Sequence, residues 1–137
     1  PFQARSAAQL ANVAKGGYVL AEAKGELKAI IIATGSEIEL AMAAHAQLDG
    51  VRVVSMPSAE VYMLQSADYR ESVLPAAIRA RVAVEASHID YWWKFVGLDG
   101  KVIGMTTFGE SAPAKALYQH FGITVEAVVS AVNELVG

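Results

Sequence analysis

The stretch "LKAIIIATGSEIEL", residues 27–40, restricts the fold more than any other part of the chain. Its core, residues 29–33, is apolar on consecutive rather than alternate positions, which is what a strand covered on both faces requires. Gly35 breaks the run, and a helical pattern follows at once. The apolar face of that helix carries one polar member, a histidine: Ile38, Ala41, Met42, His45 and Leu48. A buried central strand followed by a helix predicts an α/β fold built on a parallel sheet.

Four further strands are expected at residues 18–21, 51–56, 81–86 and 101–105. Helices are expected at 59–66, 70–78 and 114–121, and a last one, capped by Thr124, should follow. Because helix-sized connections separate most strands, we predict a three-layer α/β/α domain with a five-stranded, mostly parallel sheet. The strand at 18–21 is joined to the next by a tight turn, so it should run antiparallel if the two pair. Residues 1–16 are interpreted as a lead-in from a preceding domain, and residues 17–137 as one domain.

Composition narrows the classes of partner. Hydrophobic residues make up 54% and charged residues 18% of the chain, so excess apolar surface points to a large protein interface. The apolar runs are too short to span a membrane. With a net charge of −3 and scattered basic residues, nucleic acid is not an expected partner. The lack of cysteine favours a cytoplasmic location, and the start without methionine is expected for a piece of a longer polypeptide.

The segment "GMTTFGESAPAKALYQHFG", residues 104–122, raises the question of a nucleophilic serine. Hydrolase elbows read Gly-x-Ser-x-Gly, but Pro113 occupies the place of the second glycine. Ser111 as a helix N-cap, with Pro113 in the first turn, accounts for the same residues, because the missing N–H of proline costs nothing there. We favour the cap over the nucleophile.

Two interpretations are open for Thr34, Gly35 and Ser36, which follow the buried strand. Ser36 has capping-box spacing with Glu39 and is predicted to cap the helix. Alternatively, the three residues could hold a phosphate or nucleotide at the helix N-terminus, as in a regulatory module. Only one glycine is present, no lysine follows, and Glu37 adds negative charge, so the cap is favoured.

The remaining candidates are a carboxylate and an aromatic cluster. Glu85 ends an apolar strand, where open α/β sheets place ligands, although pairing with Arg70, Arg79 or Arg81 is the favoured role. Trp92 and Trp93 are interpreted as core and protein interface rather than a base-stacking platform. The histidines lack metal-binding spacing, so no metal site is predicted: His45, His88 and His120.

Several stretches in order resemble the carboxyl-terminal domain of bacterial transketolases, from about Gln9 to the end. They are "GGYVL", "IIIATGSEIELA", "VRVVSMPS", "YRESVLP", "RVAVEAS" and "DYWWKFVGLDGKVIGMTTFGESAPAKALYQHFGITVEAVV". Residues 60–64 depart from the acidic, Phe-rich turn frequent in that family, and Ser87 replaces its usual glycine. Both departures lie in connections between predicted elements, so they affect local loop shape rather than the resemblance.

The resemblance implies a function for the whole enzyme rather than for this segment. Transketolases bind thiamine diphosphate and a divalent cation, Mg²⁺ or Ca²⁺, and transfer a two-carbon ketol unit between ketose and aldose phosphates, as in the pentose phosphate pathway. The family's catalytic, cofactor-binding and metal-binding residues would then lie upstream, with none in this chain. The expected partners are the upstream pyrimidine- and diphosphate-binding domains and a second subunit, so this domain is expected to support interdomain packing and the homodimer.

Overall fold

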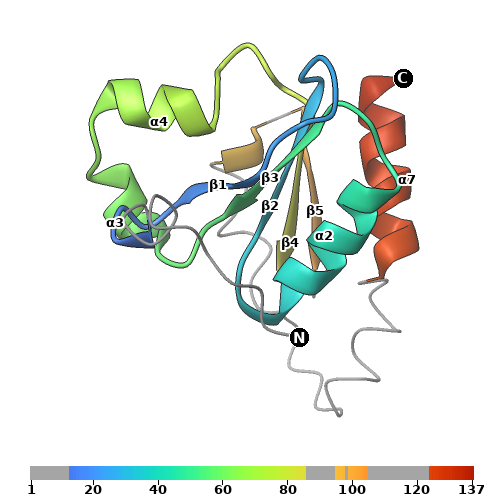
Figure 1. Cartoon of the computed structure of the whole chain (residues 1–137), viewed down its shortest axis with the longest axis horizontal. Coiled ribbons are helices and arrows are strands. Elements are labelled where there is room, and N and C mark those ends of the chain that lie inside the picture. Colours follow the sequence, from blue (N-terminus) through green and yellow to red (C-terminus); the bar gives the residue numbers. More distant parts are fainter. Residues whose placement is uncertain (1–12, 86–94, 98, 105–123) are drawn as a thin grey trace.

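A mixed β-sheet forms the centre of the protein (Figure 1). The computed structural model describes residues 13–85, 95–97, 99–104 and 124–137. Within them the sheet has five strands in the order β1-β3-β2-β4-β5. The strands are β1 (Tyr18–Ala21), β2 (Ala29–Ala33), β3 (Val51–Ser55), β4 (Arg81–Glu85) and β5 (Lys101–Gly104). The α/β class and the central place of β2 are confirmed.

The first strand does not pair with the strand that follows it along the chain. β1 runs antiparallel, but it pairs with β3 rather than with β2, through Tyr18 opposite Ser55 and Val19 opposite Val54. Both edges of β2 are already occupied, because β3 and β4 pair with it in parallel. β1 therefore lies at the outer edge of β3, and residues 22–28 lead from it to β2.

The central strand shows why its sequence is apolar at every position. All five residues of β2 are fully buried. Ala29, Ile31 and Ala33 contribute to one core cluster, whereas Ile30 and Ile32 contribute to a second. Successive side chains of a strand point to opposite faces, so each face of the sheet has its own core.

Helices lie on both faces of the sheet (Figure 1). α2 (Ile38–Ala46) and α7 (Val125–Val136) pack against each other and against the first core cluster. The shorter α3 (Ala59–Met63) and α4 (Ala67–Val73) contribute buried residues to the second cluster. α7 begins as predicted, because the Thr124 Oγ1 accepts a hydrogen bond from the Ala127 amide at 3.1 Å.

The helix predicted at residues 70–78 is displaced. α4 begins earlier because the Ser66 hydroxyl accepts a hydrogen bond from the Tyr69 amide at 3.1 Å and caps it. It ends at Val73 because Pro75 disfavours helical geometry at Leu74, which has φ −124° and ψ 77°. Residues 74–78 are therefore a connection into β4 rather than a helix.

Candidate functional site

The carboxyl end of β2 leads into the first candidate site, Thr34 to Ser36. A 3₁₀ turn, η1 (Gly35–Glu37), lies between the strand and α2, and Gly35 has a φ of +58°. The N-cap position of α2 is occupied by Glu37, whose side chain makes no capping hydrogen bond. Ser36 lies within this 3₁₀ turn, one residue before that N-cap position, and its role as a cap stays a prediction.

Two polar residues, whose burial the sequence analysis did not predict, lie at this edge of the sheet. Glu37 is 4% exposed and Ser55, at the end of β3, is 5% exposed. The position of Glu37 was a signal for its burial, because it lies between a buried strand and the helix that follows it. A carboxylate at the start of α2 competes with a phosphate for the same positive end of the helix. The phosphate role of Thr34, Gly35 and Ser36 stays a prediction.

Glu85 ends β4 and lies opposite Gly104 of β5, and nothing is described of its side chain. The arginines considered as its partners have other contacts. Arg70 donates to the Gln65 carbonyl at 3.2 Å, and Arg79 pairs with Asp99. Pairing of Glu85 therefore remains a prediction.

Four of the predicted site residues lie outside the described part of the chain. They are Trp92, Trp93, Ser111 and Pro113. Their roles as interface and helix-cap residues stay predictions.

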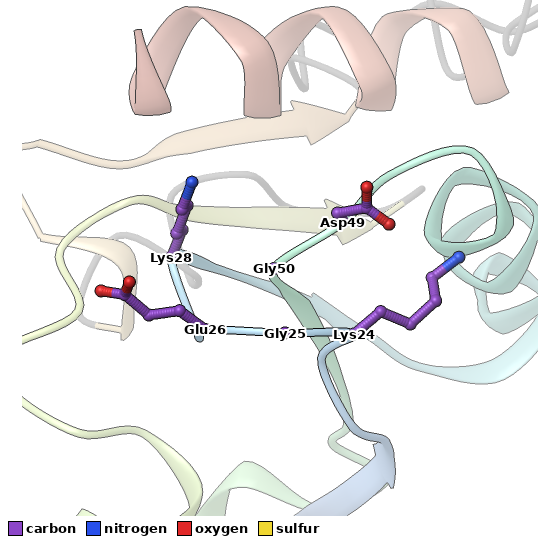
Figure 2. A pocket seen from close by; sticks show the side chains of 6 residues that line it. All are labelled: Lys24, Gly25, Glu26, Lys28, Asp49 and Gly50. Atoms are coloured by element: carbon purple, nitrogen blue, oxygen red, sulfur yellow. The ribbon is translucent and has the colours of Figure 1, made fainter.

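A hollow of about 480 Å³ opens at the opposite, amino end of β2 and β3 (Figure 2). Its lining comes from the β1–β2 and α2–β3 connections: Lys24, Gly25, Glu26, Lys28, Asp49 and Gly50. Gly50 holds its walls together, donating to the Lys24 carbonyl at 2.8 Å and accepting from the Lys28 amide at 2.7 Å. In Figure 2 the Glu26 and Asp49 side chains point in opposite directions, so the charged groups do not converge on one ligand.

A smaller hollow of about 260 Å³ beside β4 is closed on one side by Arg81. The guanidinium donates to the carbonyls of Leu74, Pro75, Ile78 and Phe95 at 2.7–3.1 Å. Burial lowers the pKa of Arg81, against the attraction of nearby Tyr62 and Glu71. With its donors directed at backbone carbonyls, Arg81 holds the 74–78 connection in place rather than binding an external anion.

Two tyrosines, Tyr62 and Tyr69, connect Gly17, α3 and α4 through hydrogen bonds. The Tyr69 hydroxyl donates to the Gly17 carbonyl at 2.7 Å, and the Tyr62 hydroxyl donates to the Arg70 carbonyl at 2.8 Å. Burial raises the pKa of Tyr62 to about 12 and also raises that of Tyr69. These phenols are kept neutral as hydrogen-bond donors, which is a structural role.

The chemistry of this part of the chain is limited. Among the described residues, no group of three or more histidine, aspartate or glutamate side chains could hold a metal ion. No helix among them is long and apolar enough to cross a membrane.

Residues 16–124 match the family described as the transketolase-like TK C-terminal domain. The chain belongs to this family. Transketolase 1 of Escherichia coli is 58% identical over 137 residues, which cover 97% of this chain and 21% of that protein. Transketolase 2 of Vibrio parahaemolyticus is 56% identical with the same coverage. The solved structure of transketolase from Leishmania mexicana superposes with a TM-score of 0.82 at 42% identity, covering 93% of this chain and 19% of that one.

These comparisons confirm the resemblance seen in the sequence. This transketolase C-terminal domain spans about a fifth of the length of the curated relatives it matches. About four fifths of the length of these relatives therefore has no counterpart in these 137 residues.

Proposed function

We propose that this chain acts as the C-terminal, non-catalytic domain of a cytoplasmic transketolase, a thiamine-diphosphate enzyme that transfers a two-carbon ketol unit between sugar phosphates. The observation that carries the proposal is the match of residues 16–124 to the family, together with 56–58% identity to bacterial transketolases. Within that enzyme the domain packs against the upstream domains and supports the homodimer. Its composition, with only 18% charged residues, supports a role in protein contacts.

The described residues do not fit thiamine diphosphate and its divalent cation. A diphosphate–metal site needs several oxygen ligands around one cation, and no such group is present among these residues. The hollow at Lys24 and Lys28 places two carboxylates, Glu26 and Asp49, in the same lining, which opposes a diphosphate. The cofactor site is therefore proposed to lie in the upstream domains.

The test compares the full polypeptide with the 137-residue segment. Each is assayed for ketol transfer from a ketose phosphate to an aldose phosphate, with thiamine diphosphate and Mg²⁺ or Ca²⁺ added. We expect turnover only from the full polypeptide. Turnover by the purified segment would contradict the non-catalytic assignment, and a full polypeptide without ketol transfer would contradict the proposed enzyme.

A further inference from the structure

Exposed apolar side chains are concentrated at one place on the described surface, the end of α3. Val61 is 36%, Met63 43% and Leu64 83% exposed. Among the described residues only one other large hydrophobic side chain is exposed, Val136 at 44%, and it lies at the end of α7. We call Val61, Met63 and Leu64 the α3 patch. Such clusters on a soluble domain mark contact surfaces.

The α3 patch is held in a defined shape. The Leu64 amide donates to the Val61 carbonyl at 3.1 Å, and the Gln65 side chain donates to the same carbonyl at 3.0 Å. Tyr62, which lies inside the patch in sequence, is 2% exposed and tied to α4 through its hydroxyl. An exposed leucine on such a fixed turn is preorganised for docking, because little conformational entropy remains to be lost.

The chain enters the domain against the same helix. The Gly16 carbonyl accepts a hydrogen bond from the Ser58 amide at 2.9 Å, one turn before the patch. A Cβ atom at Gly16 would lie only 2.9 Å from the Cβ of Val61. The Lys15 ammonium lies 4.4 Å from the centroid of the Tyr69 ring. The first residues that the structure describes, 13–17, therefore lie against α3 beside the α3 patch (Figure 1).

We propose that the α3 patch is the docking surface for the domain that precedes this one in the same polypeptide. This inference rests on the proposed function, because it takes the chain as the C-terminal fifth of a longer enzyme. A domain in the same polypeptide, connected through residues 13–17 that lie beside the patch, has a higher effective concentration there than a separate molecule, so a small apolar contact is enough to hold it. A second copy of the chain has no such advantage.

The test uses thiol labelling in the full polypeptide, since this segment contains no cysteine of its own. Met63→Cys and Val136→Cys form a matched pair, because the native side chains are 43% and 44% exposed. Leu64→Cys is the second patch variant, at a position where the side chain is 83% exposed and substitution does not disturb the core. Maleimide labelling at each position is followed by mass spectrometry of the peptides.

We expect the thiols of Met63→Cys and Leu64→Cys to react at least about tenfold more slowly than that of Val136→Cys, with equal rates after denaturation. The proposal would be overturned if Met63→Cys and Val136→Cys were labelled at equal rates, or if Leu64→Cys were labelled faster than Val136→Cys. Protection that disappears on dilution would also overturn it, because the occupant would be a second copy. Ketol transfer by the unmodified polypeptide is measured separately, so failure of the enzyme assignment is distinguishable from failure of the docking surface.

Discussion

Substitution of Gly16 by alanine tests how tightly the beginning of the domain is joined to α3. Gly16 has a φ of +86°, a conformation that residues with a side chain rarely adopt. An added Cβ would also lie well inside van der Waals contact of the Ser58 carbonyl oxygen and the Tyr62 amide nitrogen. Both are backbone atoms, so the clash cannot be relieved by a rotamer change. Either the incoming chain or α3 has to move.

The expected cost has two parts. The left-handed conformation costs an alanine about 1–2 kcal/mol. Displacement of the backbone then weakens two hydrogen bonds, Ser58 amide to Gly16 carbonyl at 2.9 Å and Tyr62 amide to Ser58 carbonyl at 3.0 Å. Each contributes about 0.5–1.5 kcal/mol. The free energy of unfolding should therefore fall by about 2–5 kcal/mol.

Gly25→Ala is the matched control for this substitution. Gly25 has a φ of +81°, but no atom lies within 4 Å of an added Cβ. It should lose only the conformational part, about 1–2 kcal/mol. Urea unfolding of the chain, followed by tryptophan fluorescence and far-UV circular dichroism, measures both. A Gly16→Ala variant that is no less stable than Gly25→Ala would refute the packing of residue 16 against α3.

Substitutions at three other contacts give separate tests. Arg52→Met should lower the free energy of unfolding in urea by about 2–3 kcal/mol, because the guanidinium donates hydrogen bonds to Glu22 and to two carbonyls of α4. Glu22→Gln changes only the exposed partner and should lower it by less than about 1 kcal/mol. The hydrogen bond from Arg52 lowers the pKa of Glu22, so that pair's contribution is present above the ordinary carboxylate pKa and lost as the pH falls, a dependence that Glu22→Gln should flatten. Because burial raises the pKa of Tyr62 to about 12, this phenol ionises first in the unfolded chain, which should lower the free energy of unfolding by about 1.4 kcal/mol by pH 11. In urea titrations Tyr62→Phe should lose less stability than the unsubstituted chain by that amount, and the loss from Tyr69, whose pKa burial also raises, should remain. Thr124→Ala removes the cap of α7 and should cost about 1 kcal/mol by the same measurement, while Thr124→Ser, which keeps the hydroxyl, should be close to neutral.

The central strand was predictable because a strand that is buried on both faces needs apolar residues at consecutive positions, and such a run is visible in the sequence. Residues 29–33 had to be apolar throughout, and the structure places them at the centre of the sheet. Pairing of β1 with β3 was not predictable in the same way. It depends on which strand edge remains free after the whole sheet has formed, and no residue of β1 encodes that choice locally.

The candidate site was less predictable than the fold. The spacing of Ser36 and Glu39 satisfies a capping box, but it does not reveal that a 3₁₀ turn, η1, precedes α2 or that Gly35 within it has a positive φ. The exposure of Leu64 was also not predictable from the sequence, because a leucine two residues from the buried Tyr62 would be expected in the core. Only the tertiary fold separates an apolar residue that is covered from one that is free to bind.

The position of β1 in the sheet has a consequence for synthesis on the ribosome. Of the strands that the structure describes, β1 leaves the exit tunnel first, yet β3, its one partner among them, is made after β2 and α2. Residues 13–21 must therefore wait, unpaired, until Ser55 and then α3 have emerged. The start of this domain is therefore fixed to the sheet late in synthesis, when β1 pairs with β3.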